Sequence, residues 1–79
     1  MKIGIIGTGY VGLPTGVGLA ELGNTVVCVD KIKEKIDMLK AGQLTIYEDG
    51  LAELFAKNTA NGRLSFTTSM KKAITGADV

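Results

Sequence analysis

The hydrophobic residues of this chain fall into short runs that have two different periods. Residues 2–6 and 25–29 are almost continuously apolar, which predicts two short buried strands. Between them, residues from about Val11 to Leu22 form an amphipathic segment, which predicts a helix that ends at Gly23. The first part of the chain is therefore predicted to fold as strand, helix and strand.

A second amphipathic segment follows these two strands. Ile32, Ile36 and Leu39 lie at helical spacing and form one apolar stripe, with charged residues outside it. Gly42 is a natural C-terminal stop for this helix. Residues 43–50 are then predicted to form a loop.

The second half of the chain continues the alternation. A third helix is predicted to end near residues 61–62, and its apolar positions are Leu51, Leu54 and Phe55. Residues 64–67 alternate as a short strand does. Ser69 is placed to cap a last helix that runs through Ile74 and ends at Gly76.

Strands that alternate with helices predict a parallel sheet with right-handed crossovers, an α/β fold of the doubly wound Rossmann type. We expect the strand at 64–67 to lie outside the strand at 25–29, which neighbours the first strand. A further strand beginning at Val79 would lie on the other side of the first. Dinucleotide-binding domains are roughly twice this long. We therefore expect residues 1–79 to be the N-terminal part of such a domain.

The turn after the first strand contains the main candidate residues for binding a ligand. It reads GTGYVG over residues 7–12, between a predicted strand and a predicted helix. Gly7 allows a sharp turn, Gly9 lets backbone N–H groups approach a pyrophosphate, and Gly12 allows close packing of the helix. The helix N-terminus would present unpaired donors to the phosphates. A glycine-rich turn without a ligand is the alternative.

Asp30 follows the second strand, where a carboxylate can accept hydrogen bonds from the hydroxyls of an adenosine ribose. A carboxylate there also repels a 2′-phosphate, so the sequence predicts NAD rather than NADP. Tyr10 could cover part of the cofactor or substrate, or be a surface tyrosine. On helix position alone, Lys35 is either a solvated lysine or reaches back to the ribose.

Small residues inside the predicted elements are interpreted as packing residues. Gly16, Gly18 and Ala20 are expected to thin the first helix so that it approaches the sheet or a neighbour. Cys28 lies inside the second strand and is expected to be an unreactive apolar filler.

Composition and charge exclude several classes of function. The net charge of +1 is spread along the chain, which argues against a nucleic acid or membrane-surface partner. One cysteine and no histidine leave neither a disulfide framework nor a metal cluster. No run approaches the roughly 20 apolar residues of a membrane span, and no signal peptide is recognised. We expect a cytoplasmic protein.

Beyond the glycines, the chain resembles the UDP-glucose/GDP-mannose dehydrogenase family over essentially its whole length. The shared segments are GYVGL at 9–13, AELG at 20–23, VD at 29–30, KI at 35–36, IYE at 46–48, GL at 50–51, GRL at 62–64 and FTT at 66–68. The sequence departs from the family pattern at Thr45 and Asp49, where prolines are common, and at Ser69, where aspartate is common.

The resemblance implies an enzyme that oxidises the C6 alcohol of a nucleotide sugar, UDP-glucose first among them, to a carboxylate with two NAD. It implies an aldehyde-level stage and a thioester on a cysteine. It assigns cofactor contacts to Val11, Asp30 and Lys35, and it implies a homo-oligomer. The family's catalytic residues lie in later segments, and Cys28 does not match the nucleophile, so we predict no catalytic residue within these 79 residues.

Two other functions share the same fingerprint. One is a non-enzymatic nucleotide-sensing module, and the other is a dehydrogenase of a hydroxy-acid or acyl substrate. The Tyr47-Glu48 loop and the Gly62-Arg63-Leu64 segment favour the nucleotide-sugar dehydrogenase. Together the predicted cofactor contacts are Gly7, Gly9, Tyr10, Val11, Gly12, Asp30 and Lys35.

Overall fold

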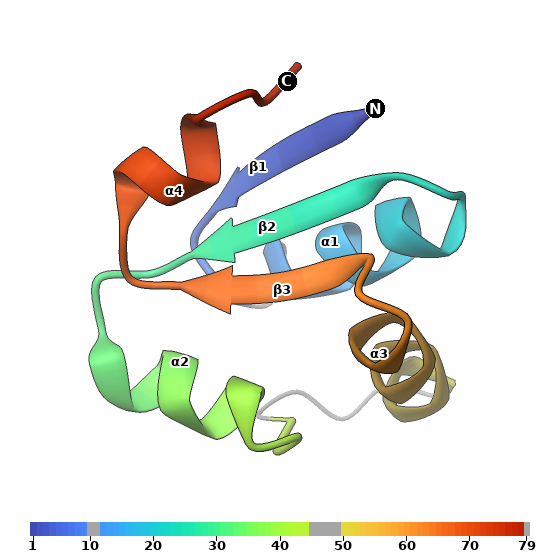
Figure 1. Ribbon diagram of the computed structural model, residues 1–79. Coiled ribbons are helices and arrows are strands. Elements are labelled where there is room, and N and C mark those ends of the chain that lie inside the picture. The colour runs from blue at the N-terminus through green and yellow to red at the C-terminus, as the bar shows by residue number, and fades with distance from the viewer. Residues whose placement is uncertain (10–11, 45–49, 79) are drawn as a thin grey trace.

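The computed structural model describes residues 1–9, 12–44 and 50–78, and these contain one sheet of three parallel strands. The strands are β1 (Lys2–Ile6), β2 (Thr25–Val29) and β3 (Leu64–Thr67), and β2 lies in the middle (Figure 1). The predicted strands, their bounds, their parallel direction and their order are confirmed.

Four helices in the described residues cover the two faces of this sheet. They are α1 (Gly12–Glu21), α2 (Lys33–Lys40), α3 (Leu51–Ala60) and α4 (Met70–Ile74). In Figure 1, α1 lies behind the sheet and α4 in front of it, which is the doubly wound arrangement expected from the sequence. None of these helices has the length and apolar character that crossing a membrane requires.

The main core lies between the sheet and the helices behind it. Phe66 on β3 packs against Phe55 on α3, with ring centroids 5.7 Å apart. The buried cluster that joins the strands to α1, α2 and α3 comprises Ile3, Leu13, Val17, Ala20, Val26, Cys28, Ile36, Leu39, Leu51, Phe55, Leu64 and Phe66. The apolar positions that predicted the elements therefore also supply most of the core.

Two glycines of α1 allow this helix to lie close to the sheet. A Cβ at Gly12 would lie 2.4 Å from the carbonyl oxygen of Gly7, and a Cβ at Gly16 would lie 3.0 Å from the Sγ of Cys28. The predicted packing roles of Gly12 and Gly16 are confirmed. The prediction for Gly18 is wrong, because this residue is exposed and a Cβ there would meet nothing within 4 Å among residues 1–9, 12–44 and 50–78.

The structure also corrects the ends of two predicted helices. Leu22 follows α1 instead of ending it, and 80% of its surface is exposed. Ile32 was predicted to begin the apolar stripe of α2, but it precedes the helix and is 42% exposed. Its backbone N–H donates to the carboxylate of Asp30, and this bond accompanies an extended conformation that delays the helix to Lys33.

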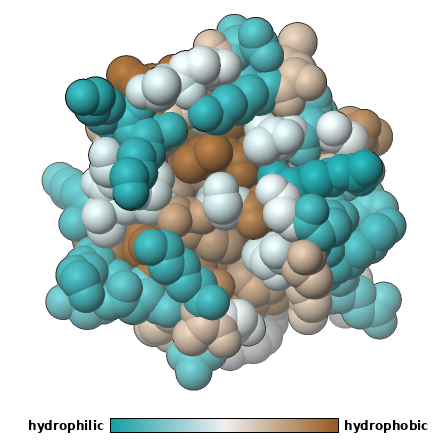
Figure 2. All heavy atoms as spheres, viewed as in Figure 1, coloured by the Kyte–Doolittle hydropathy of each residue, from teal (hydrophilic) through white to brown (hydrophobic). Residues whose placement is uncertain are grey.

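The side of the sheet in front is covered more thinly. In Figure 2, apolar residues gather over the middle of this face and hydrophilic side chains surround them. Only the short helix α4 covers it among the described elements, and Ser69 caps that helix by accepting a hydrogen bond from the backbone N–H of Lys72 at 3.3 Å. The predicted cap is confirmed. Ile6, Met70 and Ile74 stay largely exposed near this side.

After α4 the chain returns to the free edge of β1. The backbone N–H of Asp78 donates to the carbonyl oxygen of Lys2 at 2.7 Å, and the backbone N–H of Lys2 donates to the carboxylate of Asp78 at 2.9 Å. The further strand predicted to begin at Val79 lies outside the described residues. The hydrogen bonds between Asp78 and Lys2 nevertheless place residue 78 on the side of β1 where that strand was expected.

A polar contact fixes α3 against α1. The carboxylate of Glu21 accepts hydrogen bonds from the Nζ of Lys57 at 2.7 Å and from the Nδ2 of Asn58 at 2.9 Å. Asn58 is fully buried, and its amide also donates to the carbonyl oxygen of Leu54. Its Oδ1 finds no hydrogen-bond partner among the described residues.

The matched glycines of α1 give a direct test of this packing. Gly18→Ala should stabilise the protein by about 0.5–1 kcal/mol, since alanine favours the helix and meets no neighbour. Gly16→Ala should be less stable than Gly18→Ala by at least about 1 kcal/mol, because its methyl group crowds Cys28. Chemical denaturation of both variants measures the difference. Equal stabilities would contradict the close approach of α1 to β2.

The buried thiol gives a second test. Burial raises the pKa of Cys28 to about 12, so almost no thiolate is present at neutral pH. Iodoacetamide at pH 8 should leave the folded protein unmodified and should alkylate Cys28 once a denaturant unfolds it. Mass spectrometry follows the reaction. Fast alkylation of the folded protein would show that the thiol is accessible.

Candidate functional site

A sharp turn follows β1 and lies next to the carboxyl end of β2. Gly7 has a φ of 98°, a left-handed conformation that glycine adopts without strain, and its backbone N–H donates to the carbonyl oxygen of Val29 at 2.7 Å. The turn after β1 is thereby fixed to the end of β2. The predicted sharp turn at Gly7 is confirmed.

The glycine turn leaves open space where a ligand could approach the backbone. A Cβ at Gly9 would meet no atom of the described residues within 4 Å, and Gly9 is exposed. Its carbonyl oxygen accepts a hydrogen bond from the backbone N–H of Leu13, the second residue of α1, at 3.1 Å. Tyr10 and Val11, also predicted to contact the cofactor, lie outside the described residues.

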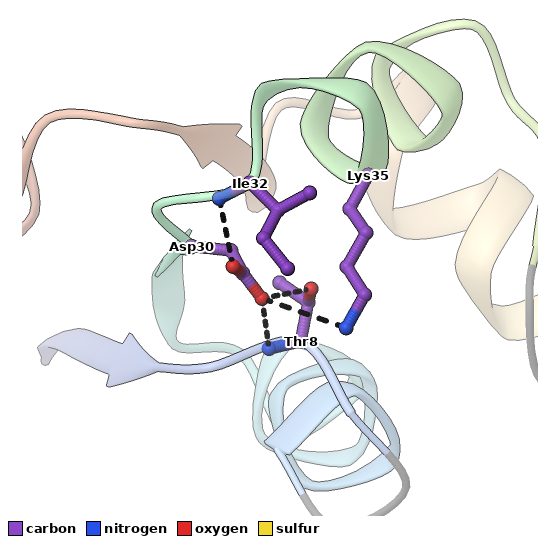
Figure 3. A network of polar contacts seen from close by, with 4 residues as sticks. All are labelled: Thr8, Asp30, Ile32 and Lys35. Carbon is purple, nitrogen blue, oxygen red and sulfur yellow. Dashed lines mark hydrogen bonds and ion pairs between the residues drawn. The ribbon is translucent and has the colours of Figure 1, made fainter.

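Asp30 follows β2 directly, and its carboxylate is the centre of a polar cluster (Figure 3). One oxygen, Oδ2, accepts hydrogen bonds from the Oγ1 of Thr8 at 2.9 Å and from its backbone N–H at 3.3 Å. The other oxygen, Oδ1, accepts a hydrogen bond from the backbone N–H of Ile32 at 3.0 Å. The carboxylate is therefore held from two sides.

These contacts keep the carboxylate ionised. The hydrogen bond from the backbone N–H of Ile32 is the largest cause that lowers the pKa of Asp30, and partial burial opposes it. Hydrogen bonds from Thr8 and the charge of Lys35 lower the pKa further. At neutral pH Asp30 is an acceptor only, which suits hydroxyl groups and opposes another anion.

Lys35 comes from the first turn of α2 and points to the same cluster (Figure 3). Its Nζ lies 4.0 Å from the Oδ2 of Asp30, and 43% of its side chain is exposed. At this distance the amino group contributes positive charge rather than a hydrogen bond. The structure thus brings Lys35 beside Asp30, the two charged residues that the sequence analysis selected.

A groove of about 390 Å³ opens beside this cluster at the carboxyl edge of the sheet. Its lining includes the end of β1, the end of β2 with Asp30, and the start of α4. Ligands of open parallel sheets bind at this edge. Cys28 does not line the groove, because it lies under α1 within the core.

Sequence reasoning missed Thr8 as a functional residue. It is 2% exposed, and both of its hydrogen-bond donors point to Asp30. The signal was present, since a hydroxyl residue follows the first glycine of the motif and a carboxylate follows the second strand. Thr68 and Met70, which line the groove, were also missed: Thr68 falls in the shared segment FTT at 66–68 but was given no role, and Met70 belongs to no motif.

Metal-binding residues do not gather in the described part of the chain: it has no group of three or more His, Cys, Asp and Glu able to hold a metal ion. The polar groups that line the groove instead include the carboxylate of Asp30, the amino group of Lys31 and the backbone of Gly7. These groups can bind hydroxyls and phosphates.

Known proteins are similar to this chain in sequence and in fold. The UDP-glucose 6-dehydrogenase of Rhizobium meliloti is 54% identical over all 79 residues, which span 18% of its length. A ternary complex of GDP-mannose dehydrogenase from Pseudomonas aeruginosa has a TM-score of 0.91 and 41% identity, over 99% of this chain and 18% of that one. For a UDP-glucose dehydrogenase from Pyrobaculum islandicum the TM-score is 0.88 and the identity 39%, over 98% and 18%.

The chain therefore spans about a fifth of the length of these relatives. Residues 1–79 match the NAD-binding domain of the UDP-glucose/GDP-mannose dehydrogenase family from end to end. The cofactor predicted from the glycine turn and from Asp30 is the cofactor of that domain. The chain belongs to the UDP-glucose/GDP-mannose dehydrogenase family, within its NAD-binding domain.

Proposed function

We propose that this chain binds the adenosine half of NAD at the groove beside Asp30, as part of an NAD-dependent 6-dehydrogenase of nucleotide sugars. The observation that carries the proposal is the ionised carboxylate of Asp30, held next to the glycine turn at the carboxyl edge of the sheet. The same position suits a ribose whose pyrophosphate lies on the turn.

The residues present fit this cofactor. An ionised carboxylate has about four lone-pair positions, and three hydrogen bonds from Thr8 and Ile32 occupy three of them. One acceptor position therefore stays available on Oδ1 for a ribose hydroxyl. Gly9 leaves room for a phosphate against the backbone, and the charge of Lys35 lies nearby.

The same carboxylate supports NAD over NADP. A 2′-phosphate would come next to the negative charge of Asp30 in a partly buried place, where repulsion is stronger than in bulk water. A hydroxyl there instead donates a hydrogen bond. The positive charge of Lys35 does not cancel this repulsion, because its amino group, 4.0 Å from the carboxylate, already offsets the charge of Asp30.

NAD bound here would supply the acceptor for the hydride removed from the substrate, and residues of this chain would bind and orient its adenosine half. Gly7, Gly9 and Gly12 shape the turn, and we assign cofactor contacts to Tyr10, Val11, Asp30 and Lys35. We assign no catalytic residue to this chain.

We propose UDP-glucose as the substrate, oxidised to UDP-glucuronate with two NAD. The UDP-glucose 6-dehydrogenase of Rhizobium meliloti supports this choice by its 54% identity. GDP-mannose is the second candidate, since a dehydrogenase of that sugar nucleotide has the TM-score of 0.91. Turnover with each sugar nucleotide, measured on the protein at its full natural length, separates the two. We further propose a homo-oligomer located in the cytoplasm.

The role of Asp30 is tested by substitution. Asp30→Ala should weaken NAD binding by about 1.5–3 kcal/mol, the contribution of a hydrogen bond to a charged group. It should also reduce the difference in affinity between NAD and NADP, because the repulsion of the 2′-phosphate is lost. Titration calorimetry with both cofactors on the protein at its full natural length provides the measurement.

Asp37→Ala is the matched control for this test. Asp37 is an exposed aspartate of α2 that pairs with Lys33, four residues before it, and does not line the groove. Its loss should leave both affinities unchanged. If Asp30→Ala behaves like this control, the ribose assignment is wrong.

Gly9→Val tests the pyrophosphate contact. A branched side chain would fill the space beside the turn, so NAD binding should be lost. The fold should survive, because a Cβ at Gly9 meets nothing within 4 Å in the described part of the chain and the backbone there is not left-handed. Calorimetry measures binding and circular dichroism checks the fold.

Gly18→Val serves as its control, since Gly18 is equally open but belongs to the far part of α1. This variant should bind NAD normally. Normal affinity in a folded Gly9→Val protein would mean that the glycines form only a turn.

A further inference from the structure

Thr8 is a buried polar residue that lies between two glycines of the turn after β1. Only 2% of its surface is exposed, although it lies between Gly7 and Gly9. A buried hydroxyl is unfavourable unless it is hydrogen-bonded. Its side chain and its backbone N–H both donate to one oxygen of Asp30, at 2.9 and 3.3 Å.

These two bonds connect parts of the chain that are 22 residues apart, the turn after β1 and the end of β2. Figure 3 shows the Asp30 carboxylate between Thr8 on one side and the backbone of Ile32 on the other. Because each carboxylate oxygen has its own fixed donor, rotation about the side-chain bonds of Asp30 would break at least one hydrogen bond.

The two oxygens of the Asp30 carboxylate differ in how many hydrogen bonds they accept within the protein. Oδ2 accepts both bonds from Thr8, which occupies its two lone pairs. Oδ1 accepts one bond from Ile32 and keeps one lone pair. The donors thus decide which oxygen stays available to a ligand and in which direction it points.

We propose that Thr8 is a positioning residue that holds the Asp30 carboxylate with Oδ1 toward the ribose, and that it thereby sets the preference for NAD over NADP. The inference rests on the proposed function of Asp30. Without the Thr8 hydroxyl the carboxylate turns more freely, so it bonds the ribose less well and swings away from a 2′-phosphate. Thr8 then affects the affinity for the cofactor although its side chain makes no contact with the cofactor.

Thr8→Val removes the hydroxyl and keeps the shape of the side chain. NAD affinity should fall roughly tenfold, the lower end of what a hydrogen bond to a charged group contributes. NADP affinity should stay the same or rise, so that the ratio of the two dissociation constants shrinks. Thr8→Ser keeps the donor and should restore both values to within about twofold. Calorimetry on the protein at its full natural length gives these constants.

Thr59→Val is the matched control, because the hydroxyl of Thr59 also donates to a buried partner, the carbonyl oxygen of Phe55, but lies on α3 away from the groove. It should change stability without changing the cofactor ratio. A Thr8→Val protein that is folded by circular dichroism and has an unchanged ratio would overturn the proposal. A Thr8→Ser protein as weak as Thr8→Val would do the same.

A double variant separates this inference from the proposed function. In an Asp30→Ala background, Thr8→Val should have no further effect on either cofactor, because its target is gone. If the two substitutions are additive instead, Thr8 acts by another route and the inference is wrong. If Asp30→Ala alone changes neither affinity, the ribose role of Asp30 fails and the role of Thr8 fails with it.

Discussion

The close approach of α1 to the sheet is the constraint on which the rest of the structure depends. The helix can lie against β1 and β2 because Gly12 and Gly16 have no side chains where it meets the Gly7 carbonyl and the Cys28 thiol. This contact fixes the start of α1 against Gly7, the residue that follows β1. Packing behind the sheet thereby determines where the N-terminus of α1 lies at the carboxyl edge of the sheet.

The polar cluster at that edge joins three parts of the fold through one carboxylate. Thr8 comes from the turn after β1, Asp30 from the end of β2 and Lys35 from α2. None of these residues alone would identify a nucleotide site. Their convergence on one side of a groove gives the site an acceptor of fixed direction next to a cation, an arrangement suited to a ribose.

Much of this could be predicted from the sequence, because hydrophobic periodicity and glycine chemistry act locally. The strands, their order and the place of Asp30 follow from patterns within short windows. The bond between Thr8 and Asp30 could not be predicted in this way, since it depends on how two distant turns meet in space. Ile32 and Gly18 were misassigned for a related reason: spacing places a residue on a face, but tertiary contacts decide whether anything covers it.

The contact between Asn58 and Glu21 has a consequence for how the domain reaches a single arrangement. Apolar side chains of α3 would tolerate small rotations and sliding of the helix, whereas a buried amide is satisfied in only a few orientations. Asn58 leaves its Oδ1 without a partner in the described structure, which lowers stability. In return its Nδ2 recognises one carboxylate on α1 and so defines the register between the two helices. The same side chain thus both lowers stability through its unpaired oxygen and restricts how α3 can lie against α1.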